Sequence, residues 1–195
     1  TQLVNTNSTP QAATLTNTGT NAISITSVAT TGPFSQTNNC PTSLAASASC
    51  TINVVFTPNK GGSLTGTLSV TDSAPNSPQT AALTGMGTVM SFSPSSLNFG
   101  TVAKGTSSPP QNITVTNLGA TTVAISKISI TGARVTSFSE TNDCPISPST
   151  LAANGTCTIS VTFTPQLKGA LNADVTLLDT GGGSPQNIPI AGTGN

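Results

Sequence analysis

The chain has 195 residues with five Lys and Arg, five Asp and Glu, no His, and a formal net charge of zero. This balance excludes a nucleic-acid-binding surface, which needs an excess of cations to replace the counterions of the phosphates. No apolar run approaches the roughly 20 residues that span a bilayer, so no membrane insertion is expected. The frequent Thr, Val and Ile residues favour β-strands over disorder.

Apolar residues in the first part of the chain change parity within one short segment. Ile23 and Ile25 lie at odd-numbered positions, whereas Val28 lies at an even-numbered one, so the three side chains cannot share one face of a regular strand. A change of this kind indicates a β-bulge or a strand that crosses between two sheets.

The next two predicted strands alternate more regularly. In "CTINVVFTP" (50–58), every second residue from Cys50 to Phe56 is apolar, which is typical of a strand with one buried face. Pro58 ends this strand because proline cannot donate a hydrogen bond to a continuing ladder. Leu64, Leu68 and Val70 predict a second strand with one buried face.

The second half of the chain repeats the first in order. The matching segments are "TPQAATLTNTG" (9–19) with "PPQNITVTNLG" (109–119), "FSQTNNCP" (34–41) with "FSETNDCP" (138–145), "CTINVVFTP" (50–58) with "CTISVTFTP" (157–165), and "SPQTAALTGMGT" (77–88) with "SPQNIPIAGTGN" (184–195). A period near 100 residues is the usual size of a β-sandwich domain. We therefore predict an all-β chain with two domains, 1–88 and 89–195, each with about seven strands in two sheets.

The segment "MSFSPSSLNFG" (90–100) has no counterpart in the first copy, because Thr1 aligns with Thr101. The first domain is therefore expected to lack its first strand, to which Phe92 and Phe99 contribute apolar side chains in the second domain. Our hypothesis is that the sequence is a window from a longer repeating chain, or that a neighbouring subunit lends the strand by β-strand addition. The predicted partners are neighbouring copies or repeats of the same chain, arranged head to tail.

The four cysteines form one pair per copy, Cys40 with Cys50 and Cys144 with Cys157. Four cysteines allow three pairings, and a disulfide within each copy is the only one that both copies can share. Two alternatives remain open: a zinc site, although there is no His and no Cys-x-x-Cys, and a pair of reduced buried thiols. Each disulfide would stabilise its domain by roughly 3 kcal/mol and would imply an oxidising compartment.

The stretch "FSPSSLNFGTVAKGTSSPPQNITVTNLG", followed by "CTISVTFTPQLKGALNADVTLLD" and "SPQNIPIAGTG", resembles the ASH-type (abnormal spindle/hydin-like) domain. More narrowly, it is similar to the bacterial secreted form that occurs in tandem arrays in large surface proteins. The resemblance covers nearly all of 89–195 and, apart from the first strand, 1–88. It implies an immunoglobulin-like β-sandwich akin to that of major sperm protein, an architectural role, and neither catalytic residues nor a cofactor.

Residues that could carry chemistry are few. The absence of His excludes a Ser-His-Asp triad. Asp72 and Asp179 occupy the same position in the two copies, where a strand enters a turn, and we expect their side chains to cap turn amides. Asp143 and two neighbouring polar residues form a candidate calcium site, but the first copy does not share these acidic residues. We therefore expect no enzyme, no metal site and no cofactor site.

The predicted function is a non-catalytic extracellular structural repeat, a rigid building block of a surface stalk or of a head-to-tail filament. The alternative is a glycan- or protein-binding adhesion module of a larger secreted protein. Glycan-binding platforms usually expose Trp or Tyr, and the chain has neither. Glycosylation sequons at Asn7, Asn112 and Asn154 would be used only in a glycosylating host.

Overall fold

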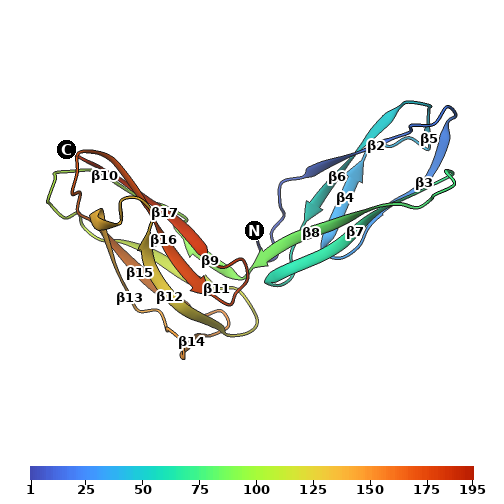
Figure 1. Cartoon of the computed structure of the whole chain (residues 1–195). Helices are drawn as coiled ribbons and strands as arrows, with labels where there is room; N and C mark the ends of the chain where they lie inside the picture. The colour runs from blue at the N-terminus through green and yellow to red at the C-terminus, as the bar shows by residue number, and fades with distance from the viewer. The chain divides into compact units, whose positions relative to one another are not determined.

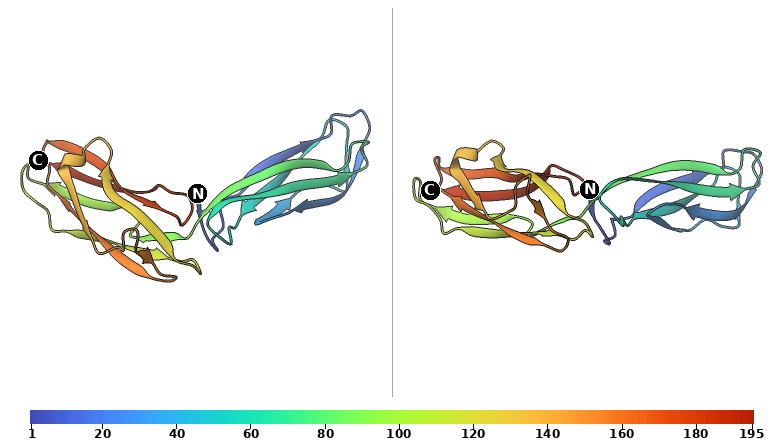
Figure 2. Two further views of the ribbon diagram at one scale, coloured as in Figure 1. Left: turned by 60° about the horizontal axis from the view of Figure 1, so that its bottom comes forward. Right: turned by 90° about the horizontal axis from the view of Figure 1, so that it is seen from below.

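The computed structural model describes residues 1–195, which divide into two compact units, Thr1–Thr88 and Val89–Asn195 (Figure 1). The regular structure is almost entirely β-strand, and the exception is a single 3-10 turn, η1 (Val135–Ser137). No helical segment has the length and hydropathy needed to cross a bilayer. Each unit is a pair of sheets, as the two further views in Figure 2 show, and the predicted all-β, two-domain sandwich fold is confirmed.

The second unit consists of a five-stranded and a four-stranded sheet. The larger sheet has the order β10 (Leu97–Val102), β17 (Gln186–Gly194), β16 (Gly169–Asp179), β12 (Val123–Thr131) and β14 (Thr150–Leu151). The smaller sheet has the order β13 (Phe138–Asn142), β15 (Thr156–Phe163), β11 (Gln111–Asn117) and β9 (Met90–Ser93). Neighbouring strands are antiparallel except for β10, which runs parallel to β17.

The first unit has the same layout with a smaller second sheet. Its five-stranded sheet has the order β1 (Gln2–Leu3), β8 (Gln79–Thr88), β7 (Gly62–Asp72), β3 (Ile23–Thr30) and β5 (Ser43–Leu44). Its other sheet has three strands, β2 (Gln11–Thr16), β6 (Ser49–Phe56) and β4 (Phe34–Asn38). Strand β1 pairs with β8 only at Gly87 and Thr88, so it corresponds to the last part of β10, and β9 has no counterpart.

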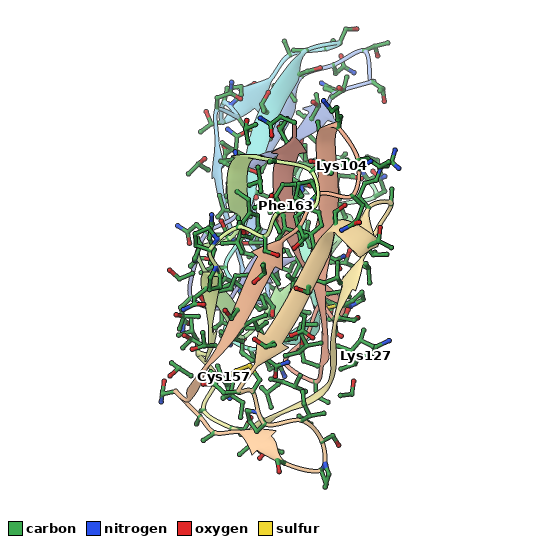
Figure 3. The ribbon with its side chains drawn as sticks, turned by 90° about the vertical axis from the view of Figure 1, so that its left-hand side faces the viewer. Lys104, Lys127, Cys157 and Phe163 are labelled. Carbon is green, nitrogen blue, oxygen red and sulfur yellow. A yellow bond between two sulfur atoms is a disulfide. The ribbon has the colours of Figure 1, made fainter.

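The repeated nine-residue segments, 50–58 and 157–165, form most of the core strands β6 and β15. In β15 the residues of one parity, Cys157, Ile159, Val161 and Phe163, have exposed fractions of 6%, 0%, 0% and 0%. The intervening residues are polar and less buried, as a strand with one face on the core requires. Figure 3 shows Cys157 and Phe163 at opposite ends of this strand, while Lys104 and Lys127 lie on the outside of the unit.

The change of parity in the first part of each copy is a β-bulge. The pairing of β3 with β7 shifts register between Ile25 and Ser27, and that of β12 with β16 shifts between Ile125 and Lys127. The extra residue lets apolar side chains on both sides of the bulge face the core. Ile125 is fully buried, and Ile128 and Ile130 pack against the same cluster.

Each unit has more strands than the seven or so predicted, because short strands such as β1, β5 and β14 lie at the edges of the sheets. The segment 90–102 is not one strand in the second unit. It pairs first with β11 as β9 and then with β17 as β10, so that one segment closes the same side of both sheets. Met90, Leu97 and Phe99 have exposed fractions of 2%, 5% and 9%, which makes this segment part of the core.

Candidate functional site

Each unit contains one disulfide at the beginning of its core strand. Cys40 is joined to Cys50 and Cys144 to Cys157, with 4.9 Å between the Cα atoms in both pairs. No cysteine is free. Each bond ties the start of β6 or β15 to the loop that follows β4 or β13.

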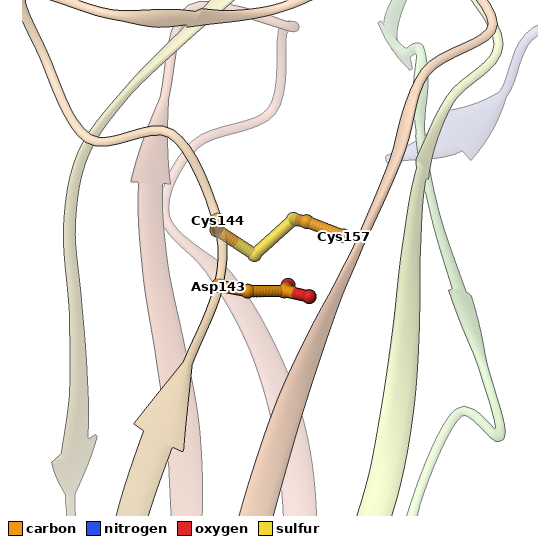
Figure 4. Close-up of side chains that lie close together, drawn as sticks. All are labelled: Asp143, Cys144 and Cys157. Atoms are coloured by element: carbon orange, nitrogen blue, oxygen red, sulfur yellow. A yellow bond between two sulfur atoms is a disulfide. The ribbon is translucent and has the colours of Figure 1, made fainter.

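The only group of potential metal ligands lies beside the second disulfide (Figure 4). The carboxylate of Asp143 and the sulfurs of Cys144 and Cys157 lie within 4.8 Å of one another. The two sulfurs are bonded to each other and so offer no thiolate to a metal. Asp143 Oδ1 instead accepts a hydrogen bond of 2.6 Å from the backbone N–H of Thr158.

The first unit has the same arrangement with uncharged residues. Asn39 Oδ1 accepts a hydrogen bond of 2.7 Å from the N–H of Thr51, as Asp143 does from Thr158. Because Asn and Asp make the same bond at the equivalent place, the geometry assigns this position to clamping the loop onto the core strand. It therefore gives no support to the candidate calcium site.

A buried asparagine supports the turn of the "TNxG" motif in each unit. Asn117 has an exposed fraction of 0%, and its Nδ2 donates to the carbonyls of Thr121, Leu151 and Ala152 at 2.8, 3.2 and 3.0 Å. Its Oδ1 accepts from the N–H of Gly119 at 2.9 Å. Asn17, with an exposed fraction of 4%, makes the equivalent bonds in the first unit. This role was not predicted, because in the sequence an Asn near a Gly is typical of any turn.

Asp72 and Asp179 cap the turns that follow β7 and β16, as predicted. Asp72 Oδ1 accepts from the N–H of Ala74 at 2.7 Å, and Asp179 Oδ1 accepts from that of Gly181 at 2.6 Å. Burial raises the pKa of Asp179 above its ordinary value, although the Gly181 N–H and the Gln186 side chain oppose the shift. These carboxylates therefore hold turns, and they belong to separate units.

Phenylalanine rings fill the end of each sandwich opposite the disulfide. In the second unit Phe163 lies 4.8 Å from Phe138 and 5.8 Å from Phe99, measured between ring centroids. In the first unit only the equivalent pair, Phe34 and Phe56, is present, at 4.9 Å. Of the six Phe side chains, Phe99, Phe138 and Phe163 are buried and Phe34, Phe56 and Phe92 are half-buried.

The first unit has two hollows on the side where the second unit carries residues 89–102. The Phe56 groove has a volume of about 520 Å³ and is lined by residues that include Gln2, Ala13, Phe34, Phe56, Leu83 and Gly85. The Asp72 hollow has a volume of about 590 Å³ and is lined by residues that include Leu15, Asn17, Gly19, Asp72, Ala74 and Gln79.

Comparison with known proteins gives a match to one domain family over both units. The sequence model of the family described as "HYDIN/CFA65/VesB-like, Ig-like domain" matches residues 2–87 and 88–193. No curated protein matches the chain.

Several solved structures are similar to the chain. A protein of unknown function from Porphyromonas gingivalis W83 is 14% identical with a TM-score of 0.44, and the match covers 98% of this chain and 93% of that one. The ASH/PapD-like domain 7 of human CEP192 is 18% identical with a TM-score of 0.39, covering 55% of this chain and 86% of that one. The VesB protease of Vibrio cholerae is 19% identical with a TM-score of 0.39, covering 54% of this chain but only 32% of the protease.

Proposed function

Because the chain belongs to the HYDIN/CFA65/VesB-like family of immunoglobulin-like domains, we propose that it is a non-catalytic structural repeat of an extracellular or cell-surface protein. It serves as a rigid building block of a stalk or of a filament in which units follow one another head to tail. Immunoglobulin-like sandwiches carry many unrelated functions, so the proposal depends on what the side chains of these two units do.

One observation carries the proposal: polar side chains at equivalent positions support the backbone in both units. Asn17 and Asn117 hold the "TNxG" turn, and Asn39 and Asp143 hold the disulfide loop. A binding or catalytic site would be expected to distinguish one unit from the other in the roles of its polar side chains. Because these residues have the same structural role in both units, they support the proposal that each unit is a structural building block.

The disulfides support the proposed location. Each unit closes one disulfide, and such bonds persist in oxidising compartments such as the cell surface and the extracellular space. The chain also has only five Lys and Arg residues in 195, which leaves few sites for trypsin-like proteases outside a cell.

The experiment is to locate the native protein in the organism that makes it. Antibodies raised against residues 1–195 are used for immunogold electron microscopy of intact cells and of the culture medium. We expect label on surface stalks or on fibres, and loss of label when intact cells are treated with a broad-specificity protease. Label confined to the cytoplasm would contradict the proposal, and saturable binding of the purified chain to a glycan array would favour an adhesion module instead.

A further inference from the structure

The turn between β14 and β15 holds the only Asn–Gly sequence of the chain, Asn154–Gly155. Asn154 is exposed, and its φ of +56° lies in the left-handed region, which Asn tolerates better than most residues. A Cβ atom added to Gly155 would lie 2.9 Å from the carbonyl oxygen of Ala152, so the chain passes too close to itself here for a larger residue. The shape of the turn therefore favours both residues of this sequence.

An Asn followed by Gly is the sequence in which the main chain most easily attacks an asparagine side chain, because glycine does not hinder the attacking nitrogen. The backbone nitrogen of Gly155 loses its proton, bonds to Cγ of Asn154 and expels the side-chain nitrogen as ammonia, which closes a cyclic imide (succinimide). Water then opens the ring. Cleavage of the bond from the nitrogen to Cγ leaves aspartate, and cleavage of its bond to the main-chain carbonyl carbon leaves isoaspartate. One water is consumed, one ammonia is released, and nothing is oxidised or reduced.

The folded turn opposes this reaction by engaging the attacking nitrogen. The N–H of Gly155 donates to the carbonyl of Ala152 at 2.9 Å. The carbonyl of Gly155 accepts from the backbone N–H of Asn117 at 3.0 Å. The residue that supplies the nitrogen is thus held through both of its backbone polar groups. The nitrogen can turn toward Cγ of Asn154 only when the turn opens, which makes local opening the step that limits the reaction.

Asn117 holds this turn from the neighbouring strand β11. Its side chain is fully buried, and its Nδ2 donates to the carbonyl of Ala152 at 3.0 Å. This is the carbonyl that accepts the N–H of Gly155. Asn117 therefore fixes the acceptor that engages the attacking nitrogen, in addition to binding Gly155 directly through its own backbone.

The first unit has the same turn without the reactive sequence. Ser47 occupies the left-handed position with a φ of +60°, and the next residue is Ala48. The N–H of Ala48 donates to the carbonyl of Ala45 at 3.2 Å, and its carbonyl accepts from the N–H of Asn17 at 2.9 Å. Because serine has no side-chain carbonyl carbon to attack, this turn cannot form the imide. The two units thus differ in chemistry at one turn whose hydrogen bonds are equivalent.

We propose that Asn154 is a site of spontaneous covalent modification, at which the amide is converted to aspartate or isoaspartate through attack by the nitrogen of Gly155. Asn117 is the positioning residue that keeps the reaction slow while the second unit is folded. The reaction proceeds from the opened turn and is confined to the second unit. The proposal concerns this turn alone, and holds whether the protein is a structural repeat or an adhesion module.

The modification would change the turn permanently. Isoaspartate adds a carbon atom to the backbone before Gly155 and leaves a carboxylate on the surface. The N–H and the carbonyl of Gly155 could then no longer both reach Ala152 and Asn117. The turn lies within the loop that the Cys144–Cys157 disulfide closes, directly before the core strand β15. A transient opening would therefore leave a lasting defect at the start of that strand.

The test is to measure the conversion of Asn154 in the complete 195-residue chain. Samples are incubated at one mildly alkaline pH and one temperature, either in native buffer or in urea that unfolds both units. Peptide mapping by mass spectrometry, with enzymatic detection of isoaspartate, measures the converted fraction at each asparagine. We expect Asn154 to react first in urea, and to react at least about tenfold more slowly in native buffer, because the folded turn must open before the attack.

Matched variants test the role assigned to Asn117. Asn117→Ala should speed the conversion in native buffer by at least about tenfold, because the turn loses a buried donor and opens more often. Gly192→Ala crowds the aromatic cluster at the other end of the same unit and should change the rate by less than about threefold. Asn17→Ala, in the first unit, should leave it unchanged. Asn154→Gly suits the positive φ and should abolish the signal without lowering the urea midpoint.

Three results would overturn the proposal. Equal rates in native buffer and in urea would show that the folded turn does not control the reaction. Faster conversion of another asparagine in urea would assign the modification to a different site. Equal acceleration by Asn117→Ala and Gly192→Ala would show that unfolding of the whole unit, and not opening of the turn, limits the rate. The comparison with urea needs no variant, so it decides the first two points even if Asn117→Ala does not fold.

Discussion

The ring of Phe163 lies directly against the backbone of Gly192. A Cβ atom added to this glycine would lie 2.4 Å from Cε1 of the ring, far inside van der Waals contact. Phe163 is fully buried and packed against two other rings, so it cannot move away. This relationship joins the "FTP" segment to the terminal "GTG" segment of the same copy, and the first unit has the equivalent pair, Phe56 and Gly85.

The first prediction concerns this contact. Gly192→Ala should lower the free energy of unfolding of the second unit by about 1–3 kcal/mol, because an extra methyl group overpacks a filled core. Urea unfolding followed by hydrogen exchange of the second unit measures the change. The matched variant Gly85→Ala should cost less, because Phe56 borders an open groove and can shift into it. Equal losses in the two units would contradict this explanation.

The second prediction concerns the buried asparagine. Asn117→Ala should destabilise the second unit by about 1–3 kcal/mol, because one buried and two partly buried carbonyls lose their donor. Asn117→Asp should cost more, since it places a carboxylate oxygen among those carbonyls. Thermal and urea unfolding measure both losses, and Asn17→Ala is the matched variant in the first unit. No measurable loss in Asn117→Ala would show that the "TNxG" turn is held by other contacts.

A third prediction concerns the disulfides. Replacing Cys144 and Cys157 together by Ser should lower the free energy of unfolding of the second unit by about 3 kcal/mol, because the unfolded chain is no longer constrained by the closed loop. Hydrogen exchange resolves the two units, and the first unit should be unchanged because its own bond remains. If reduction of the unaltered chain leaves the urea midpoint where it was, the bonds do not contribute to stability.

The fourth prediction concerns pH. Because burial raises the pKa of Asp179, the folded second unit binds a proton at a higher pH than the unfolded chain does. The free energy of unfolding should therefore increase as pH falls from 7 through the folded pKa, and this contribution should level off below the unfolded pKa. Asp179→Asn keeps an oxygen to accept from Gly181 and should remove this part of the pH dependence. An identical pH profile in the variant would assign the effect to another group.

Much of the fold could be predicted from the sequence because its signals are local and occur twice. The alternation that begins at Cys50 predicts the buried face of β6, and the change of parity after Ile25 locates the bulge in β3. Comparison of the copies also pointed to a segment present only in the second. Its division between two sheets could not be predicted, since that depends on which edges are free on both sides of the sandwich.

The roles of single polar residues were harder to predict. Asp179 follows a strand and precedes glycines, so its turn could be foreseen. Asn117 has a similar local setting but reaches carbonyls more than 30 positions away in sequence, namely those of Leu151 and Ala152. Long-range hydrogen bonds of this kind leave no periodic pattern, and neither do the shapes of the Phe56 groove and the Asp72 hollow.

The position of the disulfides has a mechanical consequence. When a unit is pulled by its two ends, the covalent bond carries the tension past the residues that it encloses, so those residues do not extend when the unit unfolds. The bonds span sequence separations of 10 and 13 residues. At about 3.5 Å per residue, they withhold roughly 35 Å of extension from the first unit and roughly 45 Å from the second. A chain under load in an oxidising environment would therefore lengthen less at each unfolding event than the same chain after reduction.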